Sequence, residues 1–233
     1  MNVLEMIVAI ILLIFAFKGL KQGLIMTVCS FVTLFLAIAL TQLVTPQVSS
    51  VIRENENIVS FLSGQVEHVL FESKTSKEDK AKSEKERIEG LSVPRVLKQE
   101  LIENNVKGTY EEIGATNFQQ YLSIYVAYSI INSITYLLVF IIILSLLKVF
   151  AHALNLVSRL PVIHTLNKVG GLGIGILEGL LITWIAFVVI TVFCSNNLGI
   201  VLYKQVEDST WLKYLYNNNI ILNAIIKVTK VLF

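Results

Sequence analysis

Residues 160–184 read LPVIHTLNKVGGLGIGILEGLLITW, and this stretch decides the fold of the chain. Its second half is apolar and carries Gly171, Gly175 and Gly179 at intervals of four residues. Four residues turn an α-helix by about 40° beyond a full circle, so the glycines form one slowly rotating stripe. Small residues let helix backbones approach closely in lipid, so the stripe predicts a membrane helix with a second helix against it. A phosphate-binding loop would need a preceding strand and a following Gly-Lys-Ser/Thr, and the stretch has neither.

Glu178 is the one formal charge well inside this apolar stretch. On an ideal helix it lies about 20° from Gly171, which places it on the glycine stripe and toward another helix. A carboxylate facing hydrocarbon is costly, so it should be protonated or paired with a base such as Lys18, Lys21 or Lys168. The alternative is an ion or proton site, and both interpretations stay open at this stage.

The overall composition also indicates a membrane protein. Of the 233 residues, 55% are hydrophobic and only 15% are charged, which is too apolar for an ordinary soluble domain. The net charge of +2 does not suggest nucleic-acid binding. Cys29 and Cys194 both lie in apolar stretches, where we expect buried thiols rather than a disulfide or a zinc site.

Long stretches without charge predict four membrane spans. Met1–Phe17 is apolar and is followed by Lys18 and Lys21, so it resembles a retained first span rather than a cleaved signal. The other three spans are expected at Leu24–Val44, ending against Thr45-Pro46, within residues 113–147, and at Leu172–Phe193. Tyr121, Tyr125 and Tyr128 would form an interfacial aromatic belt on the third span.

These spans predict an all-α membrane protein with four transmembrane helices and a long, charged, partly helical loop between the second and third. The expected segments are 1–46 with two spans, the loop 47–120, 121–195 with two spans, and an amphipathic C-terminal tail, 196–233. Within the loop, Asn57–Phe71 and a segment beginning at Pro94 show helical spacing of apolar residues. Lys74–Glu89 is nearly all charged or polar, and indicates a solvated helix or a disordered strip. We expect the amphipathic loop helices to dock at the membrane interface.

Basic residues in the short connections predict the orientation in the membrane. Lys18 and Lys21 join the first two spans, and Lys148, Arg159 and Lys168 join the last two, with no acidic residue in either connection. Short basic connections stay cytoplasmic, whereas a long loop can be exported whatever its charge. The N-terminus, the 47–120 loop and the C-terminus are therefore predicted to be extracytoplasmic.

Two motifs resemble the colicin V production protein (CvpA) family. Asn167-Lys168 precedes Gly171, Gly175 and Gly179, where the family has Asn or Asp, then Arg, then the same glycine ladder. Lys18-Gly19-Leu20-Lys21-Gln22-Gly23 is similar to the family's Arg/Lys-Gly-x-x-x-Gly turn. The resemblance covers residues 3–46 and 120–212. The chain departs from the family pattern at Glu178, a position that is often basic in the family, and in the loop between the second and third spans, which is longer than usual. It implies a multi-pass protein of the bacterial inner membrane, linked to colicin V production or export and envelope maintenance, and no defined reaction.

The sequence suggests no catalytic, cofactor or metal site. His152 and His164 flank the last short connection without a carboxylate or an HExxH motif, so we interpret them as interfacial. Ser129, Ser133 and Ser145 have no paired base, and are interpreted as forming hydrogen bonds between helices rather than as nucleophiles.

The functional expectation is therefore a non-enzymatic accessory or scaffold protein. Its expected partners are the lipid bilayer and other membrane or envelope proteins, with a homo-oligomer allowed and nucleic acid not expected. The alternative is a subunit of an oligomeric channel or transporter, which Glu178 and the glycine-rich helix would motivate.

Overall fold

The computed structural model describes residues 2–71, 83–91, 93–153, 164–193 and 196–231, and its regular elements there are helices. Four of them are long and apolar enough to cross a membrane: α1 (Val3–Gln22), α2 (Leu24–Arg53), α7 (Phe118–Ala153) and α8 (His164–Val192). Their most apolar windows have mean hydropathies of 2.3 to 2.5. The expected all-α class and the four candidate spans are thus confirmed. Arg159 and Cys194, and the side chains of His152 and His164, lie outside the described residues.

The first span begins with a capping box. The Asn2 side chain accepts a hydrogen bond from the Glu5 backbone N–H at 2.8 Å, and Glu5 accepts one from the Asn2 backbone in return. This capping box satisfies two N–H groups that a helix start leaves free. The helix then runs for 20 residues, which at 1.5 Å per residue is about the 30 Å of the hydrocarbon core.

The second span continues past the residue where the sequence predicted its end. Helix α2 runs through Pro46 to Arg53 instead of ending at Thr45-Pro46. Proline lacks the backbone donor that would bond the Gln42 carbonyl four residues earlier, yet the helix continues, so the expectation of a helix end was wrong. Just before it, Thr41 and Thr45 donate their hydroxyls to the carbonyls of Ala37 and Thr41, both at 2.7 Å, which keeps these polar groups bonded within the span.

The third span extends well beyond the bilayer. With 36 residues, α7 is about 54 Å long, so one end must project from a hydrocarbon core of about 30 Å. Tyr121 and Tyr125 are fully buried in this projecting half, with the Tyr121 hydroxyl donating to the Leu101 carbonyl at 2.7 Å. The expected aromatic belt is therefore wrong for these two residues, because they pack inside a protein core rather than against lipid headgroups.

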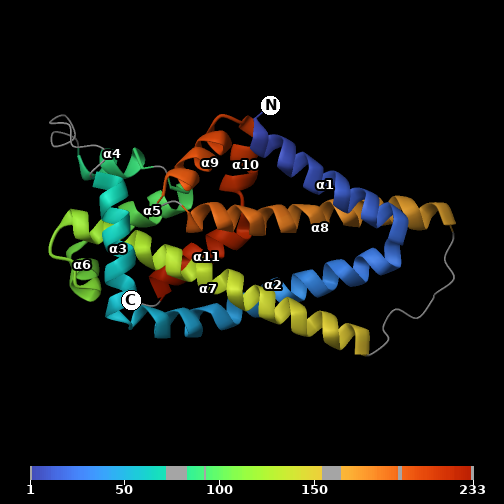
Figure 1. The fold of residues 1–233 in the computed structure, drawn as a ribbon, viewed down its shortest axis with the longest axis horizontal. Helices are drawn as coiled ribbons and strands as arrows, with labels where there is room; N and C mark the ends of the chain where they lie inside the picture. Colours follow the sequence, from blue (N-terminus) through green and yellow to red (C-terminus); the bar gives the residue numbers. More distant parts are fainter. Residues whose placement is uncertain (1, 72–82, 92, 154–163, 194–195, 232–233) are drawn as a thin grey trace.

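One hydrophobic core begins among the spans, where it includes Val8 of α1 and Phe187 of α8, and continues beyond them. Its outer part is built by α3 (Glu56–Phe71), α4 (Glu84–Glu89), α5 (Arg95–Glu103) and α6 (Lys107–Ile113) around the start of α7 (Figure 1). Both loop helices predicted from the sequence are present as α3 and α5. Ile88, Leu97 and Leu101 have no exposed surface, so α4 and α5 turn their apolar sides into this core. The expectation that the apolar sides of α4 and α5 dock at the membrane interface was thus wrong. The charged segment 74–89 ends in α4, which packs on this core.

The C-terminal helices join this core to the spans. Helices α9 (Asn197–Glu207) and α10 (Thr210–Asn217) lie beside the start of α1 (Figure 1). The Gln205 side chain accepts from the Leu4 backbone N–H at 2.9 Å, and Ser209 donates to Glu5 at 2.6 Å. Helix α11 (Ile220–Val231) is preceded by Asn219, whose side chain donates to the Trp184 carbonyl of α8 at 2.9 Å. The start of α1, the loop helices and the C-terminal helices thus share one end of the bundle.

Candidate functional site

The glycine stripe of α8 packs directly on α1, and these two helices form the most extensive pairing among the described elements. A side-chain Cβ built on Gly171 would collide with the Gly19 carbonyl oxygen and lie 2.8 Å from the Gly23 carbonyl carbon. One built on Gly175 would collide with the Phe15 carbonyl oxygen and lie 3.2 Å from the Gly19 Cα. Backbone therefore meets backbone, and no side chain fits between the helices at these positions.

The third glycine of the stripe sits in a looser contact. A Cβ on Gly179 would lie 3.1 Å from the Phe15 Cβ and 3.3 Å from a Leu12 methyl group, which are side-chain atoms. Gly173, on the same helix, has no atom within 4 Å of a built Cβ. The close approach therefore belongs to the glycines of the stripe, and it is tightest at Gly171 and Gly175.

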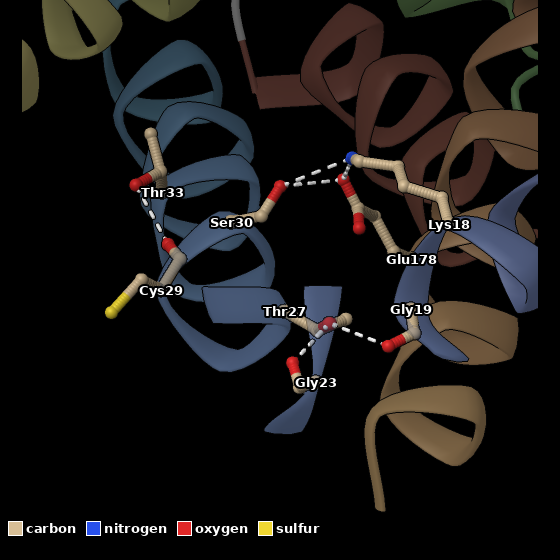
Figure 2. A network of polar contacts seen from close by, with 8 residues as sticks. All are labelled: Lys18, Gly19, Gly23, Thr27, Cys29, Ser30, Thr33 and Glu178. Carbon is tan, nitrogen blue, oxygen red and sulfur yellow. Dashed lines mark hydrogen bonds and ion pairs between the residues drawn. The ribbon is translucent and has the colours of Figure 1, made fainter. Parts of the chain in front are cut away.

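The turn between α1 and α2 is held by Asn167 of α8. Gly23 adopts φ +81°, a region that side-chain-bearing residues rarely enter, and a Cβ there would also strike the Asn167 amide. The Asn167 Oδ1 accepts from the Leu24 backbone N–H at 2.7 Å, so α8 supplies the cap for the first turn of α2. Thr27 completes the turn by donating its hydroxyl to the Gly23 carbonyl at 2.7 Å (Figure 2).

This cap predicts a moderate loss of stability on substitution. Asn167→Ala removes the acceptor for the Leu24 N–H, and should lower the free energy of unfolding by about 1 kcal/mol, as for other lost N-caps. Asn167→Asp keeps the acceptor oxygen and should retain most of the stability. Denaturant unfolding in detergent would measure the stability of both variants. An alanine variant that is as stable as the aspartate variant would contradict the capping role.

The buried carboxylate of Glu178 lies beside this turn and is engaged within the chain. Its Oε1 accepts from the Lys18 ammonium at 2.8 Å and from the Ser30 hydroxyl at 2.7 Å (Figure 2). Glu178 is only 5% exposed, whereas the Lys18 side chain is 34% exposed. Three helices thus contribute to this charge cluster of Lys18, Ser30 and Glu178, which pairs the charge inside the bundle.

The charge cluster leaves one atom without a partner. The Glu178 Oε2 is buried, and no described residue donates a hydrogen bond to it. A carboxylate has about four acceptor positions, so this oxygen has capacity for a proton or a small donor. Chemically, the arrangement can hold a charge or exchange a proton.

The structure brings most of the sequence-predicted site residues together. Gly19, Gly23, Asn167, Gly171, Gly175, Glu178 and Lys18 meet where α1, α2 and α8 converge. Lys21 and Lys168 are exposed and lie in the chain beside Gly23 and Asn167, which contact each other at this end. Sequence reasoning missed Ser30 and Thr27, because a single hydroxyl in an apolar span carries no signal of its partner.

A correction also applies to Cys29. Cys29 is exposed on the surface of α2, so the expectation of a buried thiol was wrong at this position. Its apolar neighbours Met26, Val32 and Phe35 are exposed as well, which indicates a lipid-facing side of the helix.

Comparison with known proteins gives one match. A family model described as colicin V production protein matches residues 4–71 and 113–219, which is most of the chain. The segment between the two matched parts contains α4, α5 and nearly all of α6. No curated protein and no solved structure matches the chain.

Proposed function

The chain belongs to the colicin V production protein family, and on that premise we propose that it acts as a non-enzymatic accessory or scaffold protein in toxin production or export and in envelope maintenance. Family membership suggests the role in toxin production, and the four spans support a multi-pass membrane protein. The observation that carries the scaffold role is the packed core outside the spans. It is continuous with α7, so a partner bound there would be held rigidly relative to the membrane helices.

Some large side chains on the surface of this outer part are exposed. Val106 in the loop and Tyr214 on α10 are 55% and 68% exposed, although both have large apolar groups. Burial of such side chains against a partner protein would be favourable. We therefore assign the partner-binding role to this end of the molecule.

Photo-cross-linking in cells tests the scaffold role. A photoreactive amino acid placed at Val106 or Tyr214 should yield a reproducible product of higher mass, whose partner is identified by mass spectrometry. Leu97 is fully buried and provides the matched control, where no product is expected. A product with a second copy of the chain would reveal a homo-oligomer, and absence of any product from both exposed positions would contradict the proposal.

A channel or transporter subunit is the second candidate, and one observation favours it. The buried Glu178 Oε2 has capacity for a proton or small cation inside a span. Against it, the glycine stripe is covered by α1 of the same chain and so does not line a pore. Purified protein in liposomes would conduct ions above a lipid-only baseline under this candidate, and would not under the scaffold proposal.

For location, we propose the bacterial inner membrane, with the start of α1, the 47–120 loop and the C-terminal helices on the extracytoplasmic side. Lys148 near the end of α7 and Lys168 near the start of α8 support this, because basic short connections are retained in the cytoplasm.

Cysteine labelling checks the orientation. In a background without Cys29 and Cys194, a Lys107→Cys variant should react with an impermeant thiol reagent added to intact cells whose outer barrier is permeabilised. A Lys168→Cys variant should react only after the inner membrane is opened. The reverse pattern of labelling would overturn the orientation and leave the fold unchanged.

A further inference from the structure

A shallow groove of about 530 Å³ runs along the side of α1 that does not face α8. Its wall is formed by Ile10, Leu13, Ile14 and Phe17, and its end by Lys18, Lys21 and Gln22. The four apolar side chains are each more than half exposed. All the lining residues belong to α1, so the groove is open to the lipid along its length and one extended apolar chain can lie against it.

The residues of the groove form one stripe that has the length of a single leaflet. Ile10, Ile14, Phe17 and Lys21 follow each other at intervals of three or four residues, so they share one face of the helix. From Ile10 to Lys21 the helix rises by about 1.5 Å at each of eleven steps, about 16 Å in all, which is close to half of the roughly 30 Å hydrocarbon core. The stripe thus leads from near the bilayer centre to the headgroup region at Lys21.

The charge at the end of the groove is positive and without a neighbouring acid. Within the described parts of 6–52, 113–153 and 164–206, Glu178 is the only carboxylate, and its ion pair is with Lys18. Lys21 is exposed near the end of α1, and the exposed Lys168 lies beside Asn167, which contacts Gly23 at that end. Lys21 is therefore available to an anion at the membrane surface, with the Gln22 amide as a neutral donor beside it.

We propose that this groove binds one anionic phospholipid from the leaflet on the Lys21 side. One acyl chain lies along Ile10, Ile14 and Phe17, while the lipid phosphate accepts a charge-assisted hydrogen bond from the Lys21 ammonium. Basic clusters at this depth attract anionic headgroups, and the apolar wall adds contacts that a free phosphate could not make. The Lys18–Glu178 pair keeps Lys18 turned inward, so Lys21 determines the preference for an anionic headgroup.

Quenching by brominated lipids tests this site in the full-length protein. The tryptophan fluorescence of a Phe17→Trp variant reports lipid in the groove, once the fluorescence of Trp184 and Trp211, measured in the parent protein, is subtracted. Brominated phosphatidylglycerol should quench this fluorescence more strongly than brominated phosphatidylcholine with the same acyl chains. Phe35→Trp, on the exposed side of α2, is the matched control and should show no such preference.

The role of Lys21 is tested on the Phe17→Trp background. Lys21→Gln should reduce the preference for phosphatidylglycerol about fivefold, the effect of roughly one basic residue near an anionic surface. Lys21→Arg should retain the preference, and Lys107→Gln, on α6, should not alter it. Equal quenching by the two lipids at Phe17→Trp, or a Lys21→Gln variant with an unchanged preference, would overturn the proposal.

Discussion

A Gly175→Leu variant is expected to lose about 3 kcal/mol of stability, the upper part of the range for overpacked interiors. The added side chain would start at a point where α1 presents its backbone, with the Phe15 carbonyl carbon 3.1 Å from the new Cβ. Backbone atoms of a packed helix cannot turn aside as a flexible side chain can. The two helices must therefore separate, and the interface between α1 and α8 would open along its length.

The measurement is denaturant or thermal unfolding of the purified variants in one detergent. Gly173→Leu is the matched control, because it adds the same side chain to the same helix at an exposed position with no atom within 4 Å. That control and Ile176→Leu should stay within about 0.5 kcal/mol of the parent, as surface substitutions usually do. A Gly173→Leu variant as unstable as Gly175→Leu would remove the basis for a glycine interface.

The second large effect is expected at Lys18. Lys18→Met leaves the 5% exposed carboxylate of Glu178 with Ser30 as its only hydrogen-bond donor among the described residues. Breaking a buried ion pair by removing one partner costs about 3–5 kcal/mol when both charges are buried. Because the Lys18 side chain is one-third exposed, we expect the free energy of unfolding to fall by about 3 kcal/mol, at the lower end of this range.

Glu178→Gln should be milder, with a loss of about 1 kcal/mol. The glutamine oxygen can still accept hydrogen bonds from Lys18 and Ser30, and the partly exposed ammonium can turn toward water. The double variant Lys18→Met with Glu178→Gln should be more stable than Lys18→Met alone, because it removes the uncompensated charge. A double-mutant cycle from unfolding measurements gives this coupling directly.

The control for this cycle is the exposed pair of Lys213 and Glu207, whose side chains are 46% and 40% exposed at a separation of 2.9 Å. Lys213→Met should cost at most about 0.5 kcal/mol, since exposed ion pairs contribute little. Additive effects at Lys18 and Glu178 would show that the pair does not stabilise the bundle. Glu178→Gln with normal stability but no activity in an envelope assay would instead favour the ion-site interpretation.

The sequence by itself determined the number of spans and the face on which Gly171, Gly175 and Glu178 lie. Lipid excludes uncompensated charge, so long stretches without charge mark the spans, and the 3.6-residue period of a helix places residues on one side. It also determined that Glu178 needs a partner, since a lone carboxylate in hydrocarbon is costly. These conclusions depend on residues that are close in the chain.

Only the tertiary structure decided which groups meet. It selected Lys18 from three candidate bases and added Ser30, residues 160 and 148 positions away from Glu178. It showed that Asn167 caps α2, and that Tyr121 and Tyr125 are buried in a core outside the spans rather than exposed to headgroups. Local hydropathy and spacing do not encode these contacts, because each depends on how distant helices cross.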